Sequence, residues 1–211
     1  MDSNPHITAA QQIVPLITDR INHAPTCFTI ALAGESGCGK SETSKALAEI
    51  LLQNGIHSLI IGQDNYFYLP PAENDAKRKS DNSWLGPHKE VNMSLLDNTI
   101  IAAKNGEKEI FIRNINYHTG DITLLPVSIE NIKVIIIEGT YTLLLKNVDA
   151  RIFIDANYID TLPYRQLRNR GNEVNDPFVE NILKTEHKII AGHKYLADFI
   201  ISKDYNVKQV L

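Results

Sequence analysis

The sequence predicts an α/β fold in which helices flank a mostly parallel sheet. Apolar runs alternate with longer stretches of helical pattern, which is typical of parallel α/β sheets. The apolar runs are nearly continuous in Ile, Val and Leu, as expected of strands that are covered on both faces. A glycine-rich loop joins the first run to a helix-forming segment. The expected strands are residues 28–32, 58–61, 133–137, 151–154 and 199–202.

Helices are expected wherever apolar residues recur at helical spacing. Near the N-terminus, Ile13, Ile17 and Ile21 follow this spacing and predict a helix at residues 6–22. Pro15 lies inside that stretch and marks either a kink or a later helix start. The other expected helices are residues 41–53, 93–104, 164–170 and 177–192.

Two regions interrupt the alternation of strands and helices. Residues 66–92 are polar and too long for an ordinary connection, which indicates a functional loop, here on the acceptor side of the site. Residues 109–129 show short alternating segments around Gly120-Asp121, which predict an inserted β-hairpin. Both regions are expected near the carboxyl ends of the parallel strands, where ligands of such sheets bind.

The composition is that of an ordinary globular protein. The 211 residues suit one domain, 1–211, with a small helical lid at residues 160–176. The net charge of −4 and the lack of a long basic run argue against a nucleic-acid partner. No apolar stretch is long enough for a membrane span, so no membrane partner is expected. The two cysteines, Cys27 and Cys38, suggest no disulfide framework, and a cytoplasmic location is expected.

The glycine-rich loop carries the strongest functional signal. It matches the phosphate-binding pattern G-x-x-x-x-G-K-S/T and lies between a strand and a helix, the context that this pattern requires. Its backbone N–H groups and the helix N-terminus would bind an anion, Lys40 would reach the outer phosphates, and Ser41 would ligate Mg²⁺. The expected nucleotide-binding residues, in a P-loop NTPase fold, are Gly34, Glu35, Ser36, Gly37, Cys38, Gly39, Lys40, Ser41 and Glu42.

Two acidic residues follow other expected strands. Asp64 comes after the strand at 58–61, where a carboxylate can accept a proton from an attacking hydroxyl. Glu138 comes after the strand at 133–137 and is placed to order Mg²⁺, directly or through water. The alternative interpretation of either residue alone is a solvated strand end or a helix cap. Together with the phosphate loop they favour phosphoryl transfer.

Arginines follow the fourth expected strand. Arg165 and Arg168 lie three residues apart on an expected helix and therefore face the same side. A guanidinium suits a lid that closes over a transferred phosphoryl group, and residues 171–176 are an expected hinge. A solvated basic helix face is the alternative interpretation.

These segments together resemble the uridine kinase and phosphoribulokinase family of P-loop kinases. The similarity extends from about Phe28 to Tyr205 and includes the segments 34–41, 64–68, 136–139 and 197–201. The resemblance implies ATP-dependent phosphorylation of a hydroxyl on a small metabolite, with a nucleoside such as uridine or cytidine as the first expectation. It assigns Asp64 as the catalytic base, Ser41 and Glu138 to the Mg²⁺ shell, and Arg165 and Arg168 to the lid. Because members are often oligomers, it also allows a homo-oligomer.

The acceptor side departs from the uridine kinase pattern. Leu85 stands where that pattern has the Asp that binds the ribose hydroxyls, and it cannot accept those hydrogen bonds. Glu90 or Asp81 could take over this role. The expected acceptor-binding residues are Tyr66, Trp84, Glu90, Arg113, Tyr117 and His118.

Other functions stay open at this stage. The acceptor could be a sugar, a sugar phosphate or a pantothenate-like compound, or the chain could be a catalytically reduced nucleotide-binding regulatory module. A GTP-driven switch is disfavoured, because neither an Asp-x-x-Gly segment nor an Asn/Thr-Lys-x-Asp segment occurs in the sequence. The preference for ATP over GTP rests on the resemblance.

Overall fold

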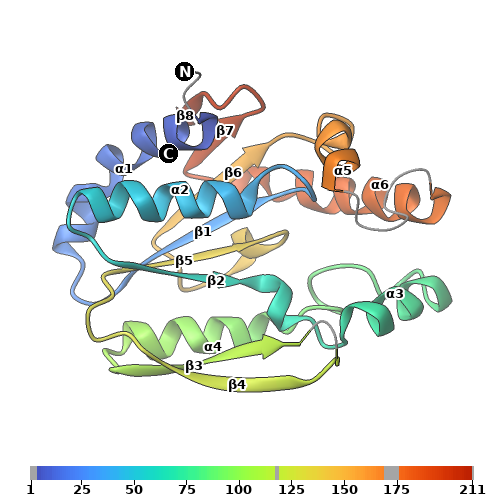
Figure 1. Cartoon of the computed structure of the whole chain (residues 1–211), viewed down its shortest axis with the longest axis horizontal. Helices are drawn as coiled ribbons and strands as arrows, with labels where there is room; N and C mark the ends of the chain where they lie inside the picture. Colours follow the sequence, from blue (N-terminus) through green and yellow to red (C-terminus); the bar gives the residue numbers. More distant parts are fainter. Residues whose placement is uncertain (1–3, 117–118, 169–175, 211) are drawn as a thin grey trace.

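In the computed structural model, which describes residues 4–116, 119–168 and 176–210, a six-stranded sheet forms the centre of the molecule (Figure 1). The first five strands in sheet order are parallel, and β8 is antiparallel to β7. This confirms the predicted α/β fold and each of the five predicted strands. The sheet order is β2 (Ser58–Gly62), β5 (Val134–Gly139), β1 (Phe28–Gly34), β6 (Ala150–Asp155), β7 (Phe199–Ser202) and β8 (Val207–Gln209).

Helices α1 (Pro5–His23) and α2 (Lys40–Gln53) cover one face of the sheet (Figure 1). The apolar face of α1 is fully buried there, against the side chains of β1 and β5 that point to the same side. The helix begins at Pro5 and continues through Pro15, so the later start considered for Pro15 is wrong.

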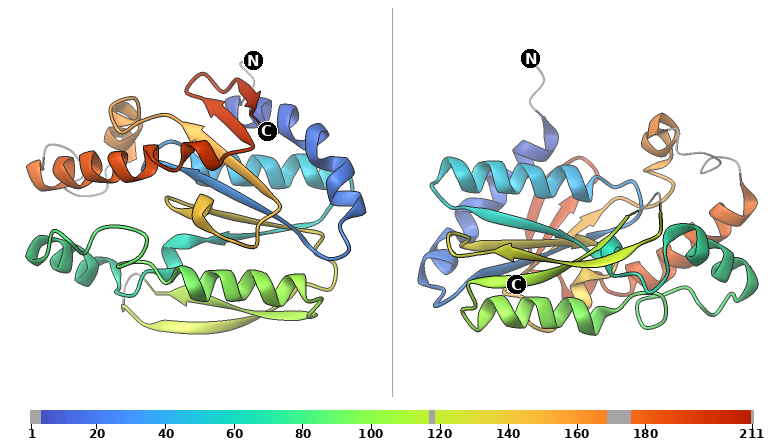
Figure 2. Two further views of the ribbon diagram at one scale, coloured as in Figure 1. Left: turned by 180° about the vertical axis from the view of Figure 1, so that it is seen from behind. Right: turned by 60° about the horizontal axis from the view of Figure 1, so that its bottom comes forward.

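The opposite face packs against α4 (Met93–Lys104), the hairpin of β3 (Glu109–Ile115) and β4 (Ile122–Ser128), and α6 (Pro177–Ala191). Figure 2 shows α4 and the hairpin on the side of the sheet away from α2. The predicted hairpin is therefore confirmed. Its strands pair antiparallel, from Glu109 with Ser128 to Ile115 with Ile122.

The expected acceptor loop at 66–92 is partly helical, which the sequence interpretation missed. Helix α3 (Pro71–Ser80) begins with a proline in its first turn, a position where the missing N–H costs nothing. The helix is short, and Asn74 is its one buried residue. Without an apolar stripe there was no helical periodicity for the sequence interpretation to detect.

The site lies at the carboxyl ends of the central strands, as expected. Strand β1 ends at Gly34, β2 at Gly62 and β5 at Gly139, and the register pairs Gly62 with Glu138. Three helices, α3, α5 (Leu162–Arg168) and α6, extend beyond this edge (Figure 1). Among the described helices, none combines the length and the apolar character that crossing a bilayer requires.

Candidate active site

The phosphate loop has a conformation that its glycines make possible. Gly37 and Gly39 have φ values of +81° and +90°, a region that L side chains rarely adopt. A Cβ on Gly39 would lie 2.5 Å from Cε1 of His6, and one on Gly37 would lie 2.8 Å from Cγ of Arg165. Helix α2 begins directly after Gly39. The loop thus presents backbone N–H groups and a helix N-terminus to the cleft, a combination that suits a triphosphate.

Lys40 lies over the same loop. Its ammonium group donates hydrogen bonds to the backbone oxygens of Gly34, at 3.0 Å, and of Glu35, at 2.9 Å. These bonds hold the positive charge of Lys40 next to the phosphate loop, where it would attract phosphate oxygens.

Ser41 and Glu138 meet at the carboxyl end of β5. The Ser41 hydroxyl donates to Oε1 of Glu138 at 3.1 Å. Burial raises the pKa of Glu138, and the charge of Asp64 adds to the rise, while Lys40 opposes it. Among the described residues there is no cluster of three His, Cys, Asp or Glu side chains for a metal. A hydroxyl and one carboxylate fit Mg²⁺, which takes few protein ligands and shares substrate phosphates.

Asp64 lies on the 3-10 helix η1 (Gln63–Tyr66), directly after β2. Its side chain is exposed and lines the same cleft as Lys40, Ser41 and Glu138. The backbone around it is firmly held. Arg113 donates from Nη1 to the backbone oxygens of Asn65, at 2.6 Å, and of Phe67. An exposed carboxylate on a fixed backbone is suited to accept a proton from a substrate.

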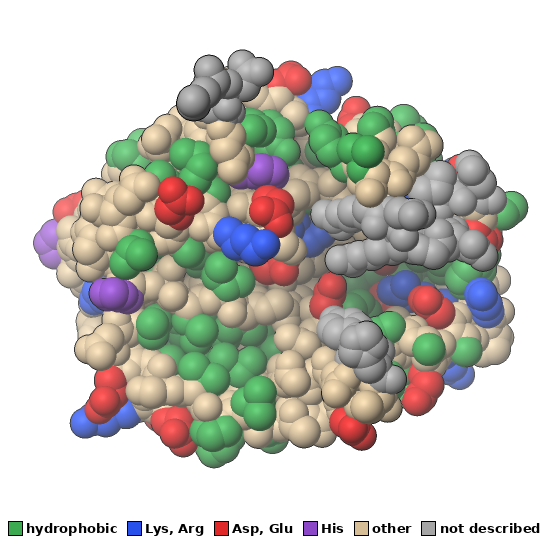
Figure 3. Space-filling view, viewed as in Figure 1, with side chains coloured by type: hydrophobic (Ala, Val, Ile, Leu, Met, Phe, Trp, Pro, Cys, Tyr) green, Lys and Arg blue, Asp and Glu red, His purple; other side chains and the backbone are tan. Residues whose placement is uncertain are grey.

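The cleft that joins these groups has a volume of about 1240 Å³. One wall is the phosphate loop and the start of α2, and the other is formed by α3 and α6. Figure 3 shows Lys, Arg, Asp and Glu side chains gathered around a hollow on the right-hand side, near the ends of these two helices. The space is large enough for a nucleotide and a small acceptor together.

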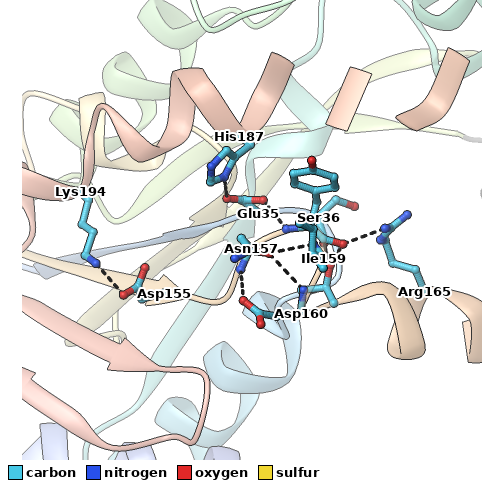
Figure 4. A network of polar contacts seen from close by, with 11 residues as sticks. Glu35, Ser36, Asp155, Asn157, Ile159, Asp160, Arg165, His187 and Lys194 are labelled. Atoms are coloured by element: carbon cyan, nitrogen blue, oxygen red, sulfur yellow. Dashed lines mark hydrogen bonds and ion pairs between the residues drawn. The ribbon is translucent and has the colours of Figure 1, made fainter. Parts of the chain in front are cut away.

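The base of the expected lid is bonded to the phosphate loop (Figure 4). The Thr161 hydroxyl donates to the backbone oxygen of Ser36 at 3.0 Å. Arg165 is buried, and its Nη2 donates to the backbone oxygen of Tyr158 at 2.9 Å. Its Nε has no hydrogen-bond partner within the described part of the chain. Arg168 ends α5, and its side chain lies outside the described residues, as do residues 169–175 of the lid.

Glu35 was expected to bind the nucleotide, and the structure shows two other partners for its buried carboxylate. Oε2 accepts a hydrogen bond from the backbone N–H of Tyr158, and Oε1 accepts one from Nδ1 of His187 on α6, both at 2.6 Å. Figure 4 shows these groups converging on Glu35. The phosphate loop is thus tied to the lid base and to α6.

Four residues expected on the acceptor side do not line the cleft: Tyr66, Trp84, Glu90 and Arg113. The Tyr66 ring lies in the core, with its hydroxyl 3.2 Å from Oγ1 of Thr99. The Trp84 indole N–H donates to Oδ1 of Asn74 at 2.7 Å, and Glu90 is fully buried. The two other expected residues, Tyr117 and His118, lie outside the described part of the structure.

Several charged residues on the cleft wall were missed in the sequence, and two of them form a pair. Arg78 on α3 and Glu186 on α6 line the cleft and lie 3.5 Å apart, measured from Nη2 to Oε1. Arg78 belongs to a Lys-Arg-Lys run that looks like an exposed basic loop, and Glu186 lies in an ordinary amphipathic helix. The sequence carries no local signal that brings them together.

Comparisons with known proteins identify similar chains. A curated relative, the bifunctional alpha-galactosidase/sucrose kinase AgaSK from Mediterraneibacter gnavus, is 25% identical over 196 residues, which are 88% of this chain and 21% of the relative. The chain therefore spans about a fifth of the length of that relative.

Two solved structures share the fold. A proposed fructose transport system kinase from Silicibacter sp. TM1040 superposes with a TM-score of 0.62 at 18% identity, covering 89% of this chain and 93% of that one. A possible uridine kinase from Bacillus stearothermophilus gives 0.59 at 14%, covering 90% and 97%. The model of the Phosphoribulokinase / Uridine kinase family matches residues 29–174, more than half of the chain. The protein belongs to the phosphoribulokinase/uridine kinase family of P-loop kinases.

Proposed function

We propose that the chain transfers the γ-phosphoryl group of ATP to a hydroxyl of a small, uncharged metabolite, with a carbohydrate as the first candidate. The observation that carries this proposal is the position of Asp64 on the wall shared with Lys40, Ser41 and Glu138. A base and a triphosphate cradle in one cleft are what in-line transfer to an alcohol needs.

The phosphate loop and Lys40 bind and orient the triphosphate. Its β- and γ-oxygens replace the backbone oxygens of Gly34 and Glu35 as partners of the Lys40 ammonium. Ser41 and Glu138 would hold Mg²⁺, which would supply positive charge to the phosphate oxygens during transfer.

Asp64 performs the acid–base step. Its carboxylate accepts the proton of the acceptor hydroxyl as the hydroxyl oxygen bonds to the γ-phosphorus and the bond to the bridging oxygen of ADP breaks. Arg165 packs its Cγ and Cδ beside Gly37 and does not line the cleft, so its role at the transferred group stays a prediction from the sequence. Arg168, on the same helix, keeps the lid role predicted from the sequence.

The acceptor class is argued from the cleft wall and from the curated relative. The wall offers Asn74, Arg78 and Glu186, all able to bond hydroxyl groups. The relative is named a sucrose kinase, which supports a neutral sugar as acceptor. A nucleoside, the first expectation from the sequence, stays a prediction. It is favoured by two aromatic rings in the cleft, Phe67 and Phe178, which could stack on a base.

An assay of ADP formation with and without candidate acceptors tests the function. The panel contains neutral sugars, uridine and cytidine, pantothenate and sugar phosphates, each with ATP or GTP and with or without Mg²⁺. We expect ADP formation that depends on both an acceptor and Mg²⁺. Hydrolysis that no acceptor stimulates would instead indicate a regulatory nucleotide-binding module.

The organisation as a single domain with a lid, the cytoplasmic location and the homo-oligomer also stay predictions. Light scattering on the purified chain measures the oligomeric state directly. A structure with a bound ATP analogue, from crystallography or electron cryomicroscopy, would show whether residues 160–176 close over the phosphates.

A further inference from the structure

The buried carboxylate of Glu90 is saturated with hydrogen bonds. Its Oε2 accepts from Nε of Arg78 at 2.8 Å and from Nδ2 of Asn74 at 3.2 Å. Its Oε1 accepts from the backbone N–H of Gly86 at 3.0 Å and from the Tyr141 hydroxyl at 3.2 Å. A fully buried carboxylate with four donors has no capacity left for a substrate. Its effect is to fix the guanidinium of Arg78.

Arg78 reaches from this buried anchor to the cleft. Nη2 lies 2.8 Å from Oε2 of Glu90 and 3.5 Å from Oε1 of Glu186, and the guanidinium lies 5.8 Å from the centre of the Phe67 ring. Its side chain is 13% exposed and lines the cleft. The orientation of the guanidinium is therefore set before any ligand arrives, which lowers the entropic cost of binding.

The negative charge of the Glu186 carboxylate has fewer compensating partners than that of Glu90. Among the described residues its carboxylate has one cationic partner, and that partner is already bound more closely by Glu90. Burial raises the pKa of Glu186 to about 7, Arg78 and Lys40 oppose the rise, and Glu90 and Asp64 add to it. The side chain is 11% exposed, and the residue lines the cleft. Such a group gains from a ligand that donates hydrogen bonds.

We propose that Glu186 and Arg78 are the acceptor-recognising pair of this kinase, and that they select a neutral polyol. Glu186 accepts a hydrogen bond from one hydroxyl of the acceptor, and Arg78 donates to a neighbouring oxygen. Both residues line the cleft that also contains Asp64. When Glu186 and Arg78 bind two oxygens of the acceptor, a neighbouring hydroxyl of the same molecule faces the Asp64 carboxylate. This inference rests on the proposed function, because it assigns the second substrate of that reaction.

The charge balance around the pair argues against an anionic acceptor. Around the pair, Glu186, Asp64 and Asp75 are acidic and Lys79 is basic, while the guanidinium of Arg78 already compensates Glu90. A phosphate or carboxylate on the acceptor would enter a region whose net charge has the same sign. Phosphorylated sugars and hydroxy acids are therefore expected to be poor acceptors.

The matched variants Glu186→Gln and Glu180→Gln test the pair. Both change the same helix in the same way, but Glu180 is exposed and outside the cleft. With the best neutral acceptor of the panel, Glu186→Gln is expected to raise the KM for that acceptor by about 10- to 100-fold, the effect of one lost charged hydrogen bond. The KM for ATP is expected to change by less than about threefold, and Glu180→Gln should match the wild type.

A second readout covers the case in which Glu186→Gln folds poorly. The wild type is assayed with a neutral sugar and with its phosphate ester, and the ratio of the two kcat/KM values is compared with that of Glu186→Asp. The Asp variant keeps the charge and shortens the side chain, so we expect a higher KM for the neutral sugar while the phosphate ester stays a poor acceptor.

Two results overturn the proposal. One is an acceptor KM in Glu186→Gln equal to that of Glu180→Gln, and the other is a wild type that prefers the phosphate ester. Both require an active kinase, so they differ from failure of the proposed function, in which no acceptor of the panel stimulates ADP formation by the wild type.

Discussion

The carboxylate of Glu35, inside the phosphate loop, accepts a hydrogen bond from Nδ1 of His187, on α6, at 2.6 Å. The two residues lie 152 positions apart in the sequence. Helix α6 also carries Glu186, the residue before His187, on the cleft wall. A partly buried hydrogen bond therefore connects the phosphate loop to the helix that forms part of the opposite cleft wall.

Loss of that bond should loosen the phosphate loop. Glu35→Gln removes the charge that strengthens the bonds from His187 and Tyr158, so we expect the free energy of unfolding to fall by about 1 kcal/mol. The KM for ATP should rise with it. Urea denaturation and steady-state kinetics measure the two effects, and Glu49→Gln, at an exposed position of α2, is the control. Identical values for the two variants would refute this coupling.

Removal of the Asp64 carboxylate should lower turnover and leave ATP binding nearly unchanged. Asp64→Asn keeps the size of the side chain and loses its ability to accept a proton, so turnover should fall by at least about 100-fold. The dissociation constant of ATP, measured by titration calorimetry, should stay within about threefold. Asp19→Asn, exposed on α1, is expected to behave as the wild type. Normal turnover in Asp64→Asn would falsify its assignment as the base.

Alanine substitutions at two glycines separate the cost of a positive φ from the cost of a steric clash. Gly39 and Gly55 both have positive φ, of +90° and +74°. A Cβ on Gly39 meets His6 at 2.5 Å, whereas one on Gly55 meets nothing within 4 Å. We expect Gly55→Ala to lower the free energy of unfolding by about 1 kcal/mol and Gly39→Ala to lower it further and to weaken ATP binding. Equal losses in thermal denaturation would show that the His6 contact yields at no cost.

The pH dependence of stability should reveal the burial of Glu186. Its pKa is raised from 4.5 to about 7, so the folded state holds the proton more tightly than the unfolded state. The resulting stabilisation is fully present below pH 4.5 and is lost as the pH rises to about 7, by an amount of about 3 kcal/mol. Glu186→Gln has no titrating group at this position, so this loss of stability with rising pH should be absent from the variant.

Urea denaturation of the wild type and of Glu186→Gln from pH 5 to pH 8 measures this difference. The stability of the variant relative to the wild type should increase with pH, and Glu180→Gln should show no such trend. A constant difference across this range would mean that Glu186 titrates near its ordinary value.

The strands and the phosphate loop could be predicted from neighbours in the sequence. Continuous apolar runs predicted β1, β2, β5, β6 and β7, and the spacing of Gly34, Gly39 and Lys40 predicted the loop between β1 and α2. The antiparallel strand β8 was missed because it is short and mostly polar. Helix α3 was missed because it buries almost none of its residues.

The charged residues in and around the cleft show why the rest of the site could not be predicted from the sequence. Glu90 was expected to bind the acceptor, but its partners Arg78, Asn74 and Tyr141 come from separate segments, and they leave it no free lone pair for a substrate. Arg113 was expected to bind the acceptor, and it donates instead to the backbone oxygens of Asn65 and Phe67. Which charged side chain is buried with which partner depends on the packing of α3 and α6, which local pattern does not report.

The sequence by itself determined the sheet, the phosphate cradle and the family, because these depend on residues that act on their near neighbours: apolar runs, glycines with positive φ, and a helix that begins at Lys40. Only the tertiary structure decided which charged groups line the cleft. The pair of Glu186 and Arg78 forms between elements about a hundred residues apart, and it is selected by the electrostatic cost of burying charges without partners.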